Sequence, residues 1–232
     1  MCRLFAYKTK NPESANKMLV QALKEFQKLS EKGCVPCGIP AGHNDGWGIA
    51  AYKNGSPFLY TRSTEPAKTD INLRKAIEII ESSKPDLVIA HLRKATTGDN
   101  SIKNTHPFLS DNISFCHNGT INGFSKSKTE SDSHKFFKQI ITEDGNFKKV
   151  YNKIKTTYSY TAMNMLFSDG KKLISVRNWN EQNPKAEELK LKEYYTLFSF
   201  KNNHSVFICS ESLKAIEKLD KKLLKNKSVN VF

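Results

Sequence analysis

The sequence lacks any long apolar run. Hydrophobic residues make up 38% of its 232 residues and charged residues 26%, and no stretch approaches the about 18 apolar residues that a membrane-spanning helix needs. The start of the chain has no basic segment followed by an apolar one, so no secretory signal is expected. We therefore expect a globular, cytoplasmic protein with no membrane association, long enough to bury one sizeable core.

Cysteine is scarce and unevenly placed. The five cysteines are odd in number and scattered along the chain, which argues against a disulfide framework and fits a reducing compartment. Cys34 and Cys37 have the C-x-x-C spacing of redox dithiols and of half a zinc site. No second such pair follows to complete a tetrahedral set, so a structural or incidental role is the favoured interpretation.

Acidic residues are in the minority, 23 against 37 Lys and Arg, for a net charge of +14. Such a balance would suit a nucleic-acid partner. The cations are mostly lysines spread over several expected elements, without the interleaved arginines and aromatics that stack on bases. We favour a solvated lysine-rich surface and expect no nucleic-acid partner; salt-dependent binding would distinguish the two alternatives.

The chain begins with Met1-Cys2. If Met1 is removed, one residue carries both a thiol, whose ordinary pKa is about 8.5, and an α-amine that titrates near pH 8. Nucleophile and base then reside in the same residue, as in an N-terminal-nucleophile enzyme. The alternative is that Cys2 is only the second residue of an ordinary start.

Periodicity predicts the early elements. Residues 3–7 are expected to form a strand, and apolar residues at three- and four-residue spacing predict helices over residues 13–32 and 69–83. The pair Asn54-Gly55 predicts a hairpin turn. The apolar run 87–90 predicts a buried central strand.

Residues 42–52 read as a glycine-rich turn that enters a strand. The glycines indicate a backbone that another segment approaches closely. A tight turn alone explains the glycines but not Asp45 and Trp47 between them, so a functional and a structural interpretation stay equally open.

Polar residues follow two of the expected strands. Arg93, after the buried strand, could present a planar fork to a carboxylate, although a surface ion pair is the simpler explanation. A second short strand ends in His117-Asn118-Gly119, where a side-chain amide and a backbone N–H can converge as in an oxyanion hole. The alternatives are an ordinary Asn-Gly turn with core histidines or, as a minor idea, a metal site of His106, Cys116 and His117.

Four motifs occur in a fixed order along the chain: Met-Cys at the start, then Asp-Gly-Trp-Gly-Ile-Ala, His-Leu-Arg-Lys-Ala-Thr, and His-Pro-Phe followed by His-Asn-Gly-Thr-Ile. Together they resemble the class II glutamine amidotransferase domain, and are most similar to its stand-alone branch, related to γ-glutamyl hydrolases of thiol metabolism. The resemblance implies an α+β fold, the four-layer αββα N-terminal-nucleophile hydrolase fold with two stacked, mainly antiparallel sheets. We expect a single domain over residues 1–232, with the motifs in residues 1–135 and the sheets and helices completed by residues 136–232.

The resemblance also implies roles for individual residues. Cys2 matches the nucleophile, Asn118 and Gly119 the oxyanion hole, and Arg93 the group that binds the substrate α-carboxylate. The remaining matches are Thr96 as a neighbouring substrate contact, His106 as a pocket residue and Asp132 as the acid that pairs with the α-ammonium. Lys94 and Thr97 depart from the pattern, because synthase-linked branches have an aromatic residue and a histidine there.

These roles agree with the chemistry of a γ-glutamyl substrate, which presents a carboxylate, an ammonium and an amide carbonyl. The expected function is hydrolysis of the γ-glutamyl amide of glutamine or a γ-glutamyl compound through a Cys2 thioester. The alternative is a non-catalytic or regulatory domain with the same fold. No phosphate-binding glycine loop and no second catalytic domain are visible. We expect no cofactor and no bound metal; release of ammonia or its delivery to a separate subunit stays open, as does the oligomeric state.

The second half carries mainly structural signals. A helix is expected over residues 133–141, a hairpin over 160–179, and strands over 194–200 and 205–209. Residues 210–213 are expected to cap a final lysine-rich helix.

Overall fold

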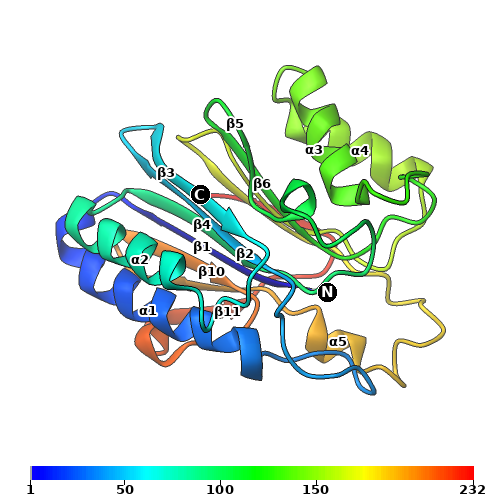
Figure 1. Ribbon diagram of the computed structural model, residues 1–232, viewed down its shortest axis with the longest axis horizontal. Helices are drawn as coiled ribbons and strands as arrows, with labels where there is room; N and C mark the ends of the chain where they lie inside the picture. Colours follow the sequence, from blue (N-terminus) through cyan, green and yellow to red (C-terminus); the bar gives the residue numbers. More distant parts are fainter. Residues whose placement is uncertain (1) are drawn as a thin grey trace.

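The computed structural model, which describes residues 2–232, stacks two antiparallel sheets face to face (Figure 1). The strands of the larger sheet are, in spatial order, β11 (Asp220–Leu223), β9 (Phe198–Lys201), β10 (Ser205–Cys209), β1 (Arg3–Thr9), β4 (Leu87–Leu92), β2 (Trp47–Lys53) and β3 (Ser56–Ser63). Those of the smaller sheet are β12 (Ser228–Val231), β8 (Leu173–Arg177), β7 (Asn164–Ser168), β6 (Ile113–Asn118) and β5 (Phe108–Ser110). Strands from both halves of the chain therefore build each sheet.

Helices cover the two outer faces of this sandwich (Figure 1). α1 (Pro12–Lys32) and α2 (Ile71–Ser83) pack on the larger sheet, and α3 (Asp132–Thr142) and α4 (Phe147–Thr157) pack on the smaller one. The four-layer αββα arrangement predicted from the sequence is thus confirmed. A short helix, α5 (Leu191–Tyr194), lies near the N-terminus.

The central strands are largely apolar because both of their faces are buried. In β1, Phe5 and Tyr7 face the helices of the larger sheet, whereas Leu4 and Ala6 face the smaller sheet. Because side chains alternate along a strand, β1 contributes to two cores, one beneath the helices of the larger sheet and one between the two sheets. A third core fills the space between the smaller sheet and its own helices.

Two expectations for the second half are wrong. No long helix follows Leu213; a single 3₁₀ turn, Lys214–Ile216, leads into β11, whose lysines point to solvent from the edge of the larger sheet. Leu213 and Ile216 are buried in the core beneath α1, and lysines suit an exposed edge strand. Tyr194, expected in a strand, lies in α5, and that strand begins at Phe198.

The predicted elements otherwise lie close to their expected positions, and α4, β5 and β12 are additions that the sequence analysis did not predict. β1 pairs with β4 so that Arg3 faces Leu92 and Leu4 faces His91. The start of β1 and the end of β4 therefore meet at one end of the sandwich, where Figure 1 also places the end of β6. Between residues 2 and 232, no helix combines the length and apolar character needed to cross a membrane.

Candidate active site

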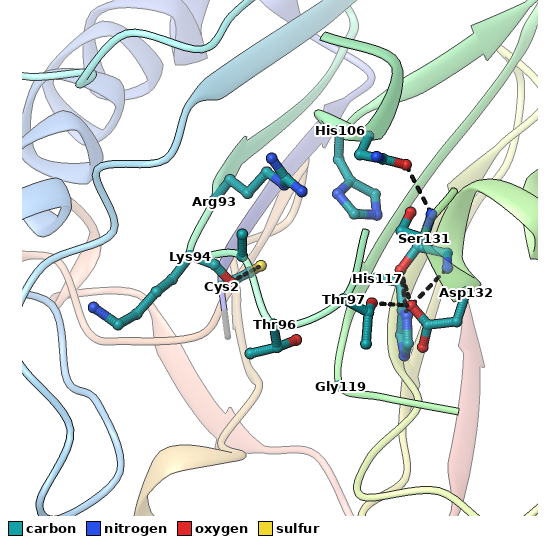
Figure 2. Close-up of a pocket in the computed structure, with 13 residues that line it drawn as sticks. Cys2, Arg93, Lys94, Thr96, Thr97, His106, His117, Gly119, Ser131 and Asp132 are labelled. Carbon is teal, nitrogen blue, oxygen red and sulfur yellow. Dashed lines mark hydrogen bonds between the residues drawn. The ribbon is translucent and has the colours of Figure 1, made fainter. Parts of the chain in front are cut away.

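A narrow pocket opens where these strand ends meet (Figure 2). It encloses about 290 Å³, including solvent at its mouth. Six of the seven predicted site residues line it: Cys2, Arg93, Thr96, His106, Gly119 and Asp132. The seventh, Asn118, lies behind the pocket wall and contacts Cys2 directly.

Cys2 sits at the start of β1 with only 6% of its surface exposed. Its Sγ atom lies 3.8 Å from the carbonyl oxygen of Lys94. Burial raises the pKa of this thiol, but the positive charge of the chain's N-terminus and the nearby His91 outweigh it and lower the pKa to about 5. The thiolate is therefore the dominant form at neutral pH, and the thiolate is the nucleophilic species.

Two oxygen atoms converge on the backbone nitrogen of Cys2. This nitrogen donates to Asn118 Oδ1 at 3.0 Å and to the hydroxyl oxygen of Tyr194 at 2.8 Å. The Tyr194 hydroxyl in turn donates to Asn118 Oδ1 at 3.2 Å. A peptide N–H has one hydrogen to share between the two acceptors, whereas an α-ammonium on the same atom could donate one hydrogen to each.

Gly119 follows β6 with a φ of +148°, a conformation that L side chains rarely adopt. A Cβ atom at this position would lie 1.9 Å from the carbonyl oxygen of Ala162. Only glycine fits at this position. Its lack of a side chain lets the backbone of the pocket wall pack directly against Ala162.

Arg93 is a buried cation without an anionic partner. Its guanidinium donates to Asn100 Oδ1 at 2.7 Å and to the carbonyl oxygen of Asp99 at 2.8 Å. Burial lowers its pKa, while the negative charges of Cys2, Asp45 and Asp99 act in the opposite direction. Within residues 2–232 no carboxylate oxygen lies within 4.0 Å of it, so its charge is available to an anionic ligand.

The glycine-rich turn before β2 supports Arg93 from the side. Asp45 accepts a hydrogen bond from the Ala95 N–H at 2.8 Å, and the Arg93 N–H donates to the Gly46 carbonyl at 2.8 Å. A Cβ on Gly48 would lie 2.3 Å from the carbonyl oxygen of His106. The turn therefore has a structural role: it braces the strand end and lets the His106 segment lie against β2.

Asp132 begins α3 and faces the pocket from the smaller sheet's side (Figure 2). Oδ1 accepts hydrogen bonds at 2.9 Å from the Thr97 hydroxyl and from the Ser133 N–H, and Oδ2 accepts one at 2.6 Å from the Ile121 N–H. Thr97, where the family pattern has a histidine in other branches, thus joins the loop after β4 to this carboxylate.

The two pocket histidines differ in their partners. His117 Nε2 lies 3.0 Å from the Ala162 carbonyl and Nδ1 lies 2.8 Å from the Ser133 hydroxyl. A carbonyl only accepts, so Nε2 carries the hydrogen and Nδ1 accepts from Ser133. His106, 4% exposed, has no hydrogen-bond partner on either ring nitrogen among residues 2–232.

The geometry does not assemble the metal set considered from sequence. Cys116 lies in the core between the sheets, while both nitrogens of its neighbour His117 are already engaged by protein atoms. No group of three or more His, Cys, Asp or Glu side chains in the described chain, residues 2–232, is arranged to hold a metal ion.

The loop between α1 and β2 covers one side of the site. Lys94, the other departure from the family pattern, extends away from the pocket centre (Figure 2) and donates to the carbonyls of Pro40 and Gly42 at 2.9 and 3.0 Å. Cys34 and Cys37, in the same loop, are exposed free thiols. The lysine thus fastens this loop to the strand end that carries Arg93.

Three residues at the site were not singled out from the sequence: Arg3, His91 and Tyr194. Arg3 Nε donates to the Cys2 carbonyl at 2.8 Å, and its guanidinium lies 4.4 Å from the centre of the Tyr194 ring. A buried arginine directly after Cys2 and a histidine inside an apolar strand were signals that could have identified the first two. Tyr194, 192 positions from Cys2, offered none.

Comparisons with known proteins agree with this geometry. The sequence model of the family described as glutamine amidotransferases class-II matches residues 1–190. The uncharacterized protein MJ1515 of Methanocaldococcus jannaschii is 31% identical over 158 residues, which cover 59% of this chain and 43% of that protein. The probable glutamine amidotransferase DUG3 of Saccharomyces cerevisiae is 31% identical over 142 residues, covering 58% of this chain and 38% of that protein. The chain thus spans about two fifths of the length of these relatives.

A solved structure supports the fold. The glutamine aminotransferase class-II domain protein SPO2029 from Silicibacter pomeroyi superimposes with a TM-score of 0.57 at 16% identity, covering 99% of this chain and 94% of that one. Similarity at this level of identity concerns the architecture, which is the N-terminal-nucleophile sandwich expected from the motifs. The family match extends over most of the chain and includes every motif at the pocket. The chain belongs to the class-II glutamine amidotransferases.

Proposed function

We propose that the protein hydrolyses the γ-glutamyl amide of glutamine or of a γ-glutamyl compound through a thioester on Cys2. The observation that carries this proposal is the position of Cys2: its low-pKa thiol lines the same small pocket as the unpaired cation of Arg93 and the carboxylate of Asp132. A nucleophile between a buried cation and an anion suits a substrate that carries an α-carboxylate, an α-ammonium and an electrophilic carbonyl.

Substrate recognition is assigned to the pocket wall. Arg93 binds the α-carboxylate through its planar guanidinium, in place of the neutral oxygens of Asn100 and Asp99 that it now contacts. Asp132 pairs with the α-ammonium, since this buried carboxyl group faces the pocket and has no cationic side-chain partner among residues 2–232. Thr96 and His106 contact the rest of the glutamyl group.

The chemistry begins at Cys2 once Met1 has been removed. The thiolate attacks the γ-carbonyl carbon, and the oxyanion is stabilised by the Asn118 amide and the Gly119 N–H. The α-ammonium of Cys2 gives its proton to the leaving nitrogen as the C–N bond breaks. Water then attacks the thioester, the α-amine takes a proton from it, and glutamate leaves as the thiolate is restored.

Contacts at the Cys2 nitrogen support the role of a free α-amine. Asn118 Oδ1 and the Tyr194 hydroxyl oxygen accept from it at 3.0 and 2.8 Å, an arrangement that an ammonium would fill with separate hydrogens. The same contacts turn the Asn118 carboxamide so that its oxygen faces Cys2 N and its NH₂ is directed elsewhere. We assign that NH₂ to the oxyanion.

Whether the released ammonia or amine enters solution or is transferred depends on whether the chain works with an acceptor subunit. Free hydrolysis yields ammonia or an amine in solution, whereas transfer requires a separate acceptor subunit. Purified protein alone, given glutamine and a panel of γ-glutamyl dipeptides, separates these cases. Steady glutamate release without any partner supports hydrolysis as the activity, and release only when a second subunit is added supports transfer.

The decisive test is intact-protein mass spectrometry after brief incubation with the glutamine analogue 6-diazo-5-oxo-norleucine, with the modified residue mapped. We expect a mass without Met1 and a single adduct on Cys2. A matched incubation with iodoacetamide shows whether the thiol is reactive in general or selective for the glutamine analogue. Retained Met1 with no adduct would contradict the proposal and favour a non-catalytic domain of this fold.

A further inference from the structure

His91 is a buried histidine that the proposed mechanism does not use. It lies in β4, is fully buried, and neither ring nitrogen makes a hydrogen bond to an oxygen or nitrogen atom of residues 2–232. An unsatisfied buried polar group costs about 1–3 kcal/mol, and native proteins keep few of them. The presence of His91 inside a buried, largely apolar strand therefore suggests a function for its ring.

Strand pairing places this ring beside the nucleophile. Leu4 pairs with His91 and Arg3 with Leu92, so Cys2, one residue before Arg3, continues toward the end of β4. Side chains two apart along a strand share a face, so Cys2 and Leu4 lie on the face that His91 occupies. Cys2 is therefore the diagonal neighbour of His91 across the β1–β4 pair, within reach of a ring nitrogen.

The opposite flank of His91 is shaped by a glycine. His91 pairs with Gly48 in β2, and the His106 carbonyl lies where a Cβ of Gly48 would be. This close approach brings the His106 ring onto His91, with ring centres 4.3 Å apart and planes inclined by 38°. His106 in turn packs on Phe108 at 4.4 Å. The imidazole of His91 is thus held on one face by a stack of rings.

Burial and the charged surroundings disfavour a positive charge on His106. Burial lowers the pKa of His106 well below its usual value, and the positive charges of His91, His117, Arg93 and Arg62 lower it further. Across the pair, burial alone would raise the pKa of the Cys2 thiol, but the N-terminus and His91 lower it. A ring N–H toward sulfur would stabilise the thiolate by a charge-assisted hydrogen bond.

We propose that His91 is a positioning residue for the nucleophile: its imidazole N–H holds the Cys2 sulfur at the pocket floor, and the stacked His106 fixes the angle of the ring. This inference rests on the proposed function only in taking Cys2 as the nucleophile. The base that moves the substrate proton remains the α-amine, so His91 acts through the thiolate.

The test compares the substitutions His91→Phe and His91→Gln, the first removing the N–H and the second keeping a donor on the side chain. The rate of Cys2 alkylation by iodoacetamide is followed across pH by mass spectrometry of the Cys2 peptide. In His91→Phe we expect the midpoint of the profile to rise by about one pH unit, which slows the reaction about fivefold at pH 5. His91→Gln should recover part of the loss.

A matched control is His204→Phe, because His204 is an exposed histidine of the β9–β10 connection. Its profile should equal that of the unsubstituted protein. An unchanged midpoint and rate in folded His91→Phe would overturn the proposal.

A second measurement needs no variant. The ¹⁵N resonances of His91 are recorded in the unsubstituted protein before and after Cys2 is alkylated, and we expect a ring nitrogen to lose its hydrogen-bonded shift. Identical resonances would overturn the proposal even if His91→Phe does not fold. Iodoacetamide requires no glutamyl recognition, so a normal His91 effect without any γ-glutamyl hydrolysis would contradict the proposed function alone.

Discussion

The two sheets give the active site two unequal walls. On the larger sheet's side, Arg93 has no carboxylate partner, and His91 and the adjoining His106 have unpaired ring nitrogens among residues 2–232. On the smaller sheet's side, His117 uses both nitrogens and Asp132 accepts hydrogen bonds from three residues, Thr97, Ile121 and Ser133. The first wall holds a cation without an ion-pair partner among residues 2–232, whereas the second is a hydrogen-bonded frame.

This difference indicates a division of labour. Under the proposed function, Arg93 exchanges neutral hydrogen-bond partners for a carboxylate, and no ion pair has to be broken first. The side chains that keep the pocket in shape each make several hydrogen bonds. A nucleophile is useful only when the carbonyl and the oxyanion donors are held at fixed positions. Substitutions on the first wall should therefore affect chemistry, and those on the second should affect stability as well.

The largest expected effect is the loss of the nucleophile. In the proposed mechanism Cys2→Ala removes the thiol that forms the thioester, so glutamate release should fall at least about 1,000-fold while the unfolding midpoint changes little. Cys37→Ala is the matched control, since Cys37 is an exposed thiol outside the pocket, and its rate should be unchanged. Full activity of Cys2→Ala would show that Cys2, on the larger sheet's wall, is not the nucleophile.

On the smaller sheet's wall, Gly119→Ala should destabilise the protein by about 4 kcal/mol, because the new Cβ would overlap the Ala162 carbonyl at an unfavourable φ. Gly38→Ala is the control: its φ is also positive, at +76°, but no atom lies within 4 Å of the added Cβ. We expect about 1 kcal/mol there. Urea unfolding measures both, and equal losses would show that the close approach to Ala162 is not what requires glycine.

Arg93→Lys tests the unpaired cation. Lysine keeps the charge but not the planar fork, so kcat/KM for a γ-glutamyl substrate should fall about 100-fold, chiefly through KM. Arg74→Lys, an exposed arginine of α2, serves as the matched control and should leave both constants unchanged. An unaltered KM in Arg93→Lys would place the α-carboxylate elsewhere.

A pH profile compares two cysteines in one sample. The pKa of Cys2 is lowered to about 5, so its thiolate persists down to that pH and its alkylation rate should fall roughly tenfold per pH unit below it. Burial raises the pKa of Cys34, so its midpoint should lie above the ordinary thiol range. Midpoints and not absolute rates are compared, because access to the two thiols differs. Coinciding midpoints would contradict the electrostatic account of Cys2.

The smallest expected effect lies where the walls meet. Thr97→Val removes the hydroxyl that donates to Asp132 Oδ1 but keeps the shape of the side chain. Loss of one hydrogen bond to a carboxylate that still accepts from Ile121 and Ser133 should cost about 1 kcal/mol and raise KM about fivefold. Thr156→Val, at an exposed position of α4, should leave KM unchanged. A KM increase as large as that of Arg93→Lys would show that the two walls are energetically coupled through this contact.

Local sequence was a good guide where one segment decides its own conformation. The helix α1 follows from apolar residues at three- and four-residue spacing and from Asn11, which caps it by accepting from the Ser14 N–H. The same reasoning failed after Leu213, where residues Asp220–Leu223 of the lysine-rich segment form an edge strand because β9 offers them a hydrogen-bonding partner. The sequence pattern also did not predict α4, so it identified only one of the two helices that cover the smaller sheet.

The sequence by itself determined the order of the motifs, the apolar strands that carry them and the glycines that let backbones approach, since each depends on neighbours a few residues away. Only the tertiary structure decided that Tyr194 reaches the Cys2 nitrogen across 192 positions and that His91 lies between Cys2 and His106. Those contacts depend on strand order and on the register of β1 against β4, which are set by packing of the whole sandwich. The identity of the nucleophile could therefore be inferred from local sequence, whereas its surroundings could not.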